Sequence, residues 1–230
     1  MIISMHTPKA GGTSFKQALE THFKDAFKSD YGDLPLIKSN SEREQQALRF
    51  KRKYQRYNYF LDAYFYKIKC IHGHFLPYKY SYYLNKKDSL FITWLREPID
   101  RLKSHYSYWF RTFDKETTTA SLQRRVVLEN WSFEKFCMHP ETANIYAKYL
   151  WSFPVTQFDF IGIFEYYSED FEYFTEQYLG LKDVQIPTRN VNKTKTSFHL
   201  SAKTIEKIKE YNSADYQIYN SALQLRNERI

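Results

Sequence analysis

Near its start the chain carries a lysine, two adjacent glycines and two hydroxyl side chains in the stretch "PKAGGTSF" (8–15). Adjacent glycines let backbone N–H groups approach an anion closely, and the positive end of the helix predicted to follow points at the same place. The alternative is a strand–helix turn that holds no ligand. The stretch predicts a cradle for a phosphate or sulfate group, made of Lys9, Ala10, Gly11, Gly12, Thr13 and Ser14.

This loop differs from two common nucleotide-binding signatures. The Walker A pattern places its lysine after the last glycine, whereas Lys9 precedes the glycine pair. The dinucleotide fingerprint needs a G-x-G, which the chain does not contain. An ATPase and a dehydrogenase are therefore disfavoured.

A second candidate anion site lies in "LREPIDRLKSHY" (95–106). Arg96 ends a predicted strand, and Ser104 lies on the helix that Pro98 is expected to open. The planar fork of donors on an arginine suits a phosphate, and a serine hydroxyl can add one more hydrogen bond. Standing alone, the segment would be better explained by a surface arginine and a helical serine.

Two histidines flank a glycine in "HGHF" (72–75), at the end of another predicted strand. If the strand continues through this stretch, the side chains of His72 and His74 point to the same face. Histidine is the usual general base near neutral pH, so either ring is a candidate base. Two polar loop histidines without a catalytic role are the alternative.

The elements that position these clusters alternate along the chain. Short apolar runs predict strands at 1–5, 67–72, 89–95 and 158–164, and helical periodicity fills 14–23, 39–66, 98–110, 131–138, 142–151, 168–179 and the region after 201. This order is typical of an α/β fold, a parallel sheet with helices on both faces, and no linker divides residues 1–230, so we expect a single domain. All three clusters then fall at the carboxyl ends of strands, where such folds bind ligands.

Composition limits the partners. Lys and Arg exceed Asp and Glu, which leaves a net charge of +8 and favours an anionic partner such as a nucleotide, a nucleic acid or an acidic polysaccharide. Much of the excess lies in "RFKRKYQRY" (49–57), which is either a solvated helix face or a rim for an anionic acceptor. Two cysteines are too few for a disulfide framework, and no metal-ligand spacing stands out.

Together, the first two clusters resemble a known family. "PKAGGTSF" is similar to the 5′-phosphosulfate loop of the sulfotransferases, and "LREPIDRLKSHY" resembles their 3′-phosphate element. Further matches resemble the carbohydrate branch, the heparan sulfate 2-O- and 6-O-sulfotransferase-like group: "HGHF", "NIYAKYL" (144–150), "FDFIGIFEYYSEDF" (158–171) and "NVNKT" (190–194). The resemblance covers nearly the whole chain and implies one sulfotransferase domain with a P-loop-like fold.

The resemblance also implies ligands and roles. The co-substrate would be 3′-phosphoadenosine 5′-phosphosulfate (PAPS), with its 5′-phosphosulfate on residues 9–14, its 3′-phosphate on Arg96 and Ser104, and Asn192, Lys193 and Thr194 closing over the nucleotide. His74 would be the general base, with His72 assisting it or binding the acceptor, and Lys9 would stabilise the leaving phosphate. The acceptor would be a hydroxyl of a carbohydrate or glycoconjugate, anionic or neutral, and no metal is expected.

Two other classes of function remain open from the sequence. One is a non-catalytic protein that binds nucleic acid or another polyanion, which the net charge and the 21 tyrosines would suit. The other is a nucleotide kinase of related fold, which the missing Walker lysine disfavours. If the chain is an enzyme of the family, we expect no nucleic-acid partner, no membrane contact and a cytoplasmic, bacterial location. A Golgi enzyme cut from its anchor is the alternative, because its sequence would look the same.

Overall fold

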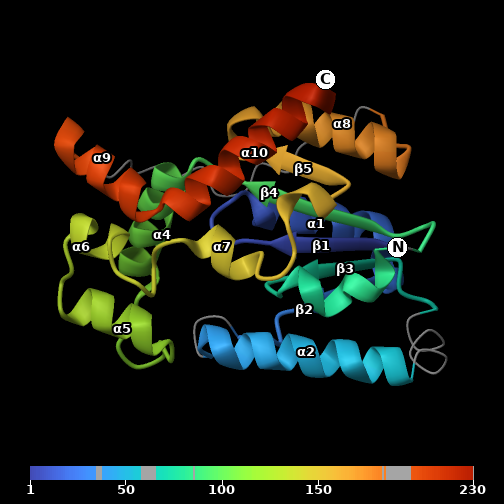
Figure 1. Cartoon of the computed structure of the whole chain (residues 1–230), viewed down its shortest axis with the longest axis horizontal. Coiled ribbons are helices and arrows are strands. Elements are labelled where there is room, and N and C mark those ends of the chain that lie inside the picture. Colours follow the sequence, from blue (N-terminus) through green and yellow to red (C-terminus); the bar gives the residue numbers. More distant parts are fainter. Residues whose placement is uncertain (35–37, 58–65, 85, 183, 185–197, 230) are drawn as a thin grey trace.

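The computed structural model describes residues 1–34, 38–57, 66–84, 86–182, 184 and 198–229. Within them, parallel strands form one sheet in the order β2-β3-β1-β4-β5 (Figure 1). The strands are β1 (Ile2–His6), β2 (Phe27–Asp30), β3 (Cys70–Gly73), β4 (Leu90–Leu95) and β5 (Phe160–Ile163). The parallel sheet predicted from the sequence is confirmed. The edge strand β2 was not predicted, because its four residues, FKSD, are mostly polar and carry no apolar run.

Nine α-helices are described, several of them shorter than the sequence patterns indicated. They are α1 (Gly12–Phe23), α2 (Asn40–Arg56), α4 (Pro98–Thr112), α5 (Ser121–Leu128), α6 (Phe133–Cys137), α7 (Ile145–Tyr149), α8 (Tyr167–Leu179), α9 (Ala202–Tyr211) and α10 (Ser213–Arg229). The helix expected over 39–66 ends at Arg56, and residues 58–65 lie outside the described part. Where one final helix was expected after residue 201, the structure has two, α9 and α10, which meet at the buried Asn212. Helix α5 was not predicted.

Helices cover both faces of the sheet, as expected. On one face, Ile2 of β1 packs with Phe15 of α1 and Phe171 of α8. On the other face, the next residue, Ile3, belongs to a cluster with Tyr146 of α7 and Tyr219 of α10. Successive side chains of a strand point to opposite faces, so the adjacent isoleucines of β1, at the centre of the sheet, pack into the helical layers on both sides.

A third apolar cluster lies beyond the carboxyl ends of the strands. It joins α4, α5, α6 and α9 through residues such as Leu102, Val126, Phe136 and Ile208. In Figure 1, α4, α5 and α6 lie on the side toward which the strand arrows point. This helical wall therefore borders the edge of the sheet where the candidate clusters were expected. None of the described helices is both long and apolar enough to cross a membrane.

The close pairing of β2 with β3 leads to a first prediction. A Cβ at Gly73 would lie 1.7 Å from the carbonyl oxygen of Asp30, a backbone atom that cannot move without disturbing the sheet edge. We expect Gly73→Ala to lower the free energy of unfolding by about 3 kcal/mol, measured by denaturant titration. Gly32→Ala is the control, because its Cβ would meet only the Asp30 side chain at 3.5 Å. Equal stability of the two variants would contradict this packing.

Candidate functional site

The loop between β1 and α1 has an unusual backbone. Lys9 and Gly11 both adopt positive φ, 71° and 85°. For a lysine this conformation is strained by roughly 1–2 kcal/mol, and such strain is commonly found at functional sites. The two glycines also have packing roles: a Cβ at Gly11 would lie 2.9 Å from the Phe164 ring, and one at Gly12 would lie 2.0 Å from His6.

The N-terminus of α1 is open to an anion. Its N-cap, Gly11, offers no side-chain hydrogen bond, and the first turn contains no acidic residue. The first N–H groups of a helix have no partner inside the helix, and they carry partial positive charge. Thr13 is exposed and Ser14 is partly exposed in the same turn, whereas Ala10 is fully buried. The loop thus has the features of the predicted cradle.

Lys9 lies among other cations. Its Nζ sits 4.0 Å from the centroid of the Tyr108 ring on α4. Burial, with Arg111 and Arg96 adding repulsion, lowers the pKa of Lys9 to about 8. The lysine charge is therefore held where the protein itself disfavours it, and a bound anion would offset that cost.

Arg96 lies next to the same loop, where its charge acts on Lys9. Its backbone is clamped by Tyr146: the Arg96 N–H donates to Tyr146 Oη at 2.9 Å, and that hydroxyl donates to the Arg96 carbonyl at 2.6 Å. The guanidinium lies 4.5 Å from the Phe164 ring centroid, and its buried Nε has no hydrogen-bond partner among the described residues. The structure thus brings together Lys9 and Arg96, from two loops that are far apart in sequence.

The other residues of the predicted nucleotide site are less well placed by the structure. Ser104 is partly exposed in the second turn of α4, on the helix that follows Arg96. No described contact links it to Arg96, so its role stays a prediction. Asn192, Lys193 and Thr194 lie outside the described residues.

Three histidine rings are stacked beside the loop. The His6 ring lies between those of His72 and His74, with centroids 5.7 and 4.9 Å away and interplanar angles of 16° and 26°. His74 Nδ1 lies 2.5 Å from the His6 carbonyl oxygen. A carbonyl only accepts hydrogen bonds, so Nδ1 carries the proton, and Nε2 of the neutral ring holds the free lone pair.

Environment separates the two histidines of "HGHF". His72 is 1% exposed, its Nδ1 contacts Ser4 Oγ at 2.9 Å, and burial, with smaller contributions from His74 and Lys16, lowers its pKa to about 3. His74 is partly exposed, and burial also lowers its pKa, assisted by the charge of Arg43 and opposed by the hydrogen bond to His6. Both rings are neutral near pH 7, but His74 alone of the two has access to solvent.

Two arginines that sequence reasoning missed are buried near these groups. Arg43 on α2 is 3% exposed and Arg101 on α4 is fully buried, yet in the described part of the chain the Nε and Nη2 atoms of both have no hydrogen-bond partner. Burying a charge costs several kcal/mol unless it is paired. A sequence signal for Arg43 did exist: it shares a helical face with Ala47, Phe50 and Tyr54, at i, i+4, i+7 and i+11.

Two other features do not add to the site. His105 packs edge-on against Trp109 and Phe136, 4.5 and 5.8 Å between centroids, so its role is internal packing. A surface hollow of about 460 Å³ opens along the first half of α2, and none of its described lining residues is a histidine. Its described lining residues are Lys38, Ser41, Glu42, Gln45, Gln46 and Arg49. Among the described residues, no group of three or more His, Cys, Asp or Glu is arranged to hold a metal ion.

Comparison with known proteins gives one likeness to report. No protein-family model matches the chain, and neither does any curated protein. Among solved structures, a sulfotransferase from Alicyclobacillus acidocaldarius is similar over 95% of both chains, with 15% sequence identity and a TM-score of 0.45. A likeness this distant does not establish a shared function, and it says nothing about an acceptor.

The geometry of His74 predicts its protonation state. We expect a neutral ring with the proton on Nδ1 at pH 7, and a pKa below 6.5, because burial and Arg43 disfavour the charged form. Nitrogen-15 NMR of the imidazole across pH 4–8 reports both quantities. Arg43→Met should raise the pKa, since it removes a positive charge. A proton found on Nε2 of wild type at pH 7 would contradict the hydrogen bond to His6.

Proposed function

We propose that the protein is a sulfotransferase that moves a sulfuryl group from PAPS to a hydroxyl of an acceptor, a carbohydrate or glycoconjugate. One observation carries the proposal. At the carboxyl edge of the sheet, Lys9, Arg96 and the open N-terminus of α1 form a cationic site beside His74, a neutral histidine whose Nε2 lone pair is free. A group-transfer enzyme with an anionic donor and a hydroxyl acceptor needs these two features side by side.

The residues present fit the donor. The first-turn N–H groups of α1, with Lys9, Thr13 and Ser14, would hold the 5′-phosphosulfate. Arg96, whose buried Nε lacks a partner, would hold the 3′-phosphate together with Ser104. The two sites lie on the loops that follow the adjacent strands β1 and β4, so a single nucleotide can contact both.

The roles in the chemical step follow from position. In an in-line displacement, the acceptor oxygen forms a bond to sulfur while the bond from sulfur to the leaving phosphate oxygen breaks. His74 Nε2 would take the acceptor proton, and the charged Lys9 would stabilise the negative charge that develops on the leaving phosphate. His72 is too buried to reach an acceptor as it stands. Its expected assistance is therefore indirect, through the ring stack that orients His6 and His74.

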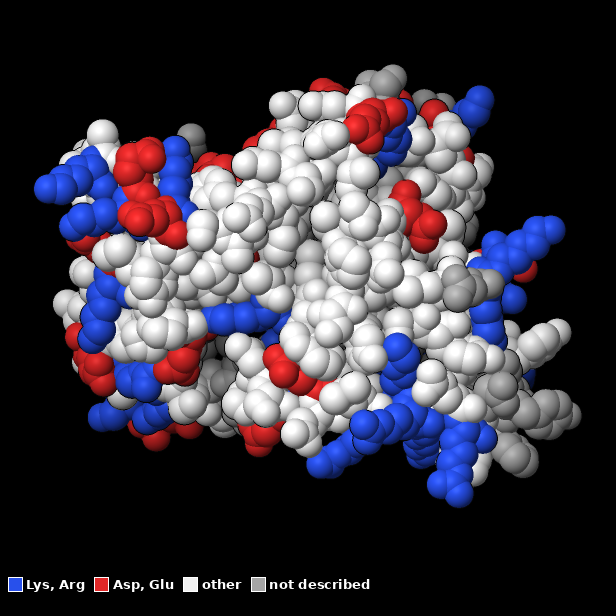
Figure 2. Space-filling model, in the orientation of Figure 1, with Lys and Arg blue, Asp and Glu red and all other residues white. Residues whose placement is uncertain are grey.

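One observation favours the alternative of a non-catalytic polyanion binder. The exposed cations Arg52, Lys53 and Arg56 crowd the second half of α2, and Figure 2 shows basic side chains gathered there. In Figure 1, this end of α2 lies on the side where the strands begin. The histidines lie at the opposite, carboxyl ends of the strands. A helix rises about 1.5 Å per residue, so these residues are roughly 14–20 Å along the axis from Arg43. They are thus poorly placed as a rim of the proposed active site.

Calorimetric titration with adenosine 3′,5′-bisphosphate, the donor without its sulfuryl group, tests the proposed function. We expect the bisphosphate to bind at least tenfold more tightly than adenosine 5′-phosphate or magnesium-free ATP, because two separate cationic sites then act together. Equal affinities would overturn the donor assignment. Salt-sensitive binding to nucleic acid without this preference would favour the polyanion binder, and magnesium-dependent ATP turnover would favour a kinase.

Arg96→Ala should abolish the preference for the 3′-phosphate. A charge-assisted hydrogen bond contributes about 1.5–3 kcal/mol, so the bisphosphate should bind roughly tenfold to a hundredfold more weakly while adenosine 5′-phosphate is nearly unaffected. Arg125→Ala is the control, because Arg125 is exposed and paired with Glu141. A variant that keeps the wild-type preference would remove Arg96 from the 3′-phosphate site.

Lys9 should make nucleotide binding depend on pH. Its pKa of about 8 means that most molecules carry the charge at pH 7 and few do at pH 9. The phosphates are fully ionised over this range, so affinity for the bisphosphate should fall roughly tenfold between pH 7 and 9. In Lys9→Arg the dependence should vanish, because arginine stays charged. A pH-independent wild type would contradict direct contact of Lys9 with the ligand.

A further inference from the structure

Arg43 is a buried cation for which the described protein provides no counter-ion. Its side chain is 3% exposed, and its Nε and Nη2 atoms have no acceptor. A second buried arginine shows the usual arrangement: Arg226 is 5% exposed, and it donates to Asp170 at 2.8 Å and to Glu169 at 2.7 Å. The protein therefore provides carboxylates for the buried guanidinium of Arg226, whereas part of the Arg43 guanidinium has no described partner.

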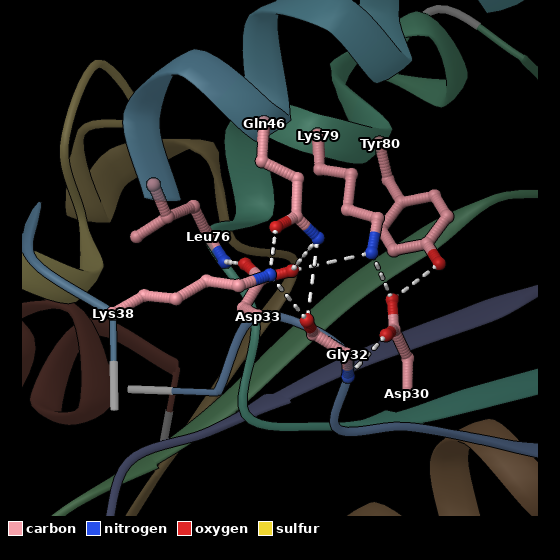
Figure 3. A network of polar contacts seen from close by, with 8 residues as sticks. All are labelled: Asp30, Gly32, Asp33, Lys38, Gln46, Leu76, Lys79 and Tyr80. Atoms are coloured by element: carbon pink, nitrogen blue, oxygen red, sulfur yellow. Dashed lines mark hydrogen bonds and ion pairs between the residues drawn. The ribbon is translucent and has the colours of Figure 1, made fainter. Parts of the chain in front are cut away.

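The position of Arg43 is held firmly by the rest of α2. Ser39 and Glu42 form a capping box at the start of the helix. One turn further on, Gln46 reaches the Gly32 carbonyl at 3.3 Å and Asp33 at 3.5 Å (Figure 3). These contacts fix the first two turns of α2 against the loop that follows β2.

The carboxylates of this edge are already engaged. Asp33 accepts from the Leu76 N–H at 2.9 Å and from Lys79 at 3.3 Å, in addition to Gln46. Asp30 accepts from Lys79 at 2.6 Å and from Tyr80 at 2.7 Å (Figure 3). No described hydrogen bond or ion pair joins Arg43 to Asp30, which ends β2, or to Asp33, on the loop that follows β2. These two carboxylates therefore do not satisfy the unpartnered donors of Arg43.

Arg43 is connected to the proposed base through Tyr149. The Arg43 guanidinium sits 4.4 Å from the centroid of the Tyr149 ring, and that ring lies 6.3 Å from His74, whose pKa the Arg43 charge lowers. The Tyr149 hydroxyl is buried and has no hydrogen-bond partner either. Two guanidinium nitrogens and one phenol hydroxyl without a described partner thus belong to Arg43 and Tyr149, and the Tyr149 ring neighbours the partly exposed His74.

We infer that Arg43 and Tyr149 form a binding site for an anionic oxygen group of the acceptor, a carboxylate or a sulfate ester, which places a neighbouring hydroxyl against His74 Nε2. The inference rests on the proposed function and adds to it the chemical class of the acceptor. A planar fork with an added hydroxyl matches an oxyanion, and binding would satisfy all three unmatched donors. A neutral acceptor would leave the Arg43 charge buried and uncompensated, so the site selects against neutral acceptors.

The stability of ligand-free variants tests whether Arg43 serves the fold. Arg43→Met removes an unpaired buried charge at nearly constant volume, so the melting temperature should be unchanged or higher. Arg226→Met, the matched control, removes one of the two arginines that pair with the buried Asp170, the other being Arg229, and should lower the melting temperature by about 5 °C or more. If the two variants lose the same stability, Arg43 is a structural residue and the inference fails.

Anion binding is tested with inorganic sulfate on protein saturated with adenosine 3′,5′-bisphosphate, at constant ionic strength. The His74 imidazole signals in NMR should shift saturably, and the pKa of His74 should rise as the anion offsets the Arg43 charge. In Arg43→Met the apparent affinity for sulfate should drop at least tenfold, while the affinity for the bisphosphate, measured separately, stays as in wild type. Tyr149→Phe, which removes only the hydroxyl, should show a smaller loss of sulfate affinity.

The outcomes separate the two proposals. No saturable response of His74 in wild type, or the same response in Arg43→Met, would overturn the acceptor site while leaving the donor site intact. Failure of the bisphosphate to bind would instead overturn the proposed function on which the acceptor site rests.

Discussion

The candidate site depends on positive charges that carboxylates of the described protein do not neutralise. Lys9, Arg43, Arg96 and Arg101 converge on the carboxyl edge of the sheet, and buried nitrogen atoms of the three arginines have no acceptor in the described structure. Two other buried cations are paired with carboxylates: Lys79 with Asp30 and Asp33, and Arg226 with Asp170. Because unpaired burial is costly, the difference marks where anionic ligands are expected.

Aromatic rings explain how these cations are held without carboxylates. Lys9 lies over Tyr108, Arg96 over Phe164 and Arg43 over Tyr149, with 4.0–4.5 Å between each charge centre and ring centroid. A cation over an aromatic face gains about 0.5–2 kcal/mol, yet its N–H groups at the periphery remain available for a ligand. The high aromatic content of the chain, 19% of residues, thus supports both the core and the charged site.

The stacked rings of His72, His6 and His74 connect the proposed general base with the proposed donor site. Because β1 pairs with β3 in register, His6 at the end of one strand meets the histidines at the end of the next. The close packing of His6 against Gly12, where a Cβ would not fit, places the base next to the N-terminus of α1. A glycine at position 12 is therefore required by the histidine as well as by any anion on the loop.

The sequence by itself determined the parallel sheet, most of its strands and the three clusters at their carboxyl ends, because hydrophobic periodicity and glycine turns are local signals. It also singled out Lys9, Arg96, His72 and His74, residues that the structure gathers at one edge of the sheet. Only the tertiary structure decided which nitrogen of His74 is free, because that depends on a carbonyl 68 residues away. It alone revealed the unpaired burial of Arg43 and Arg101, since whether a charge has a partner is settled by packing between distant segments. The polar edge strand β2 and the break at Asn212 escaped prediction for the same reason: their stability comes from neighbours in space and not from their own residues.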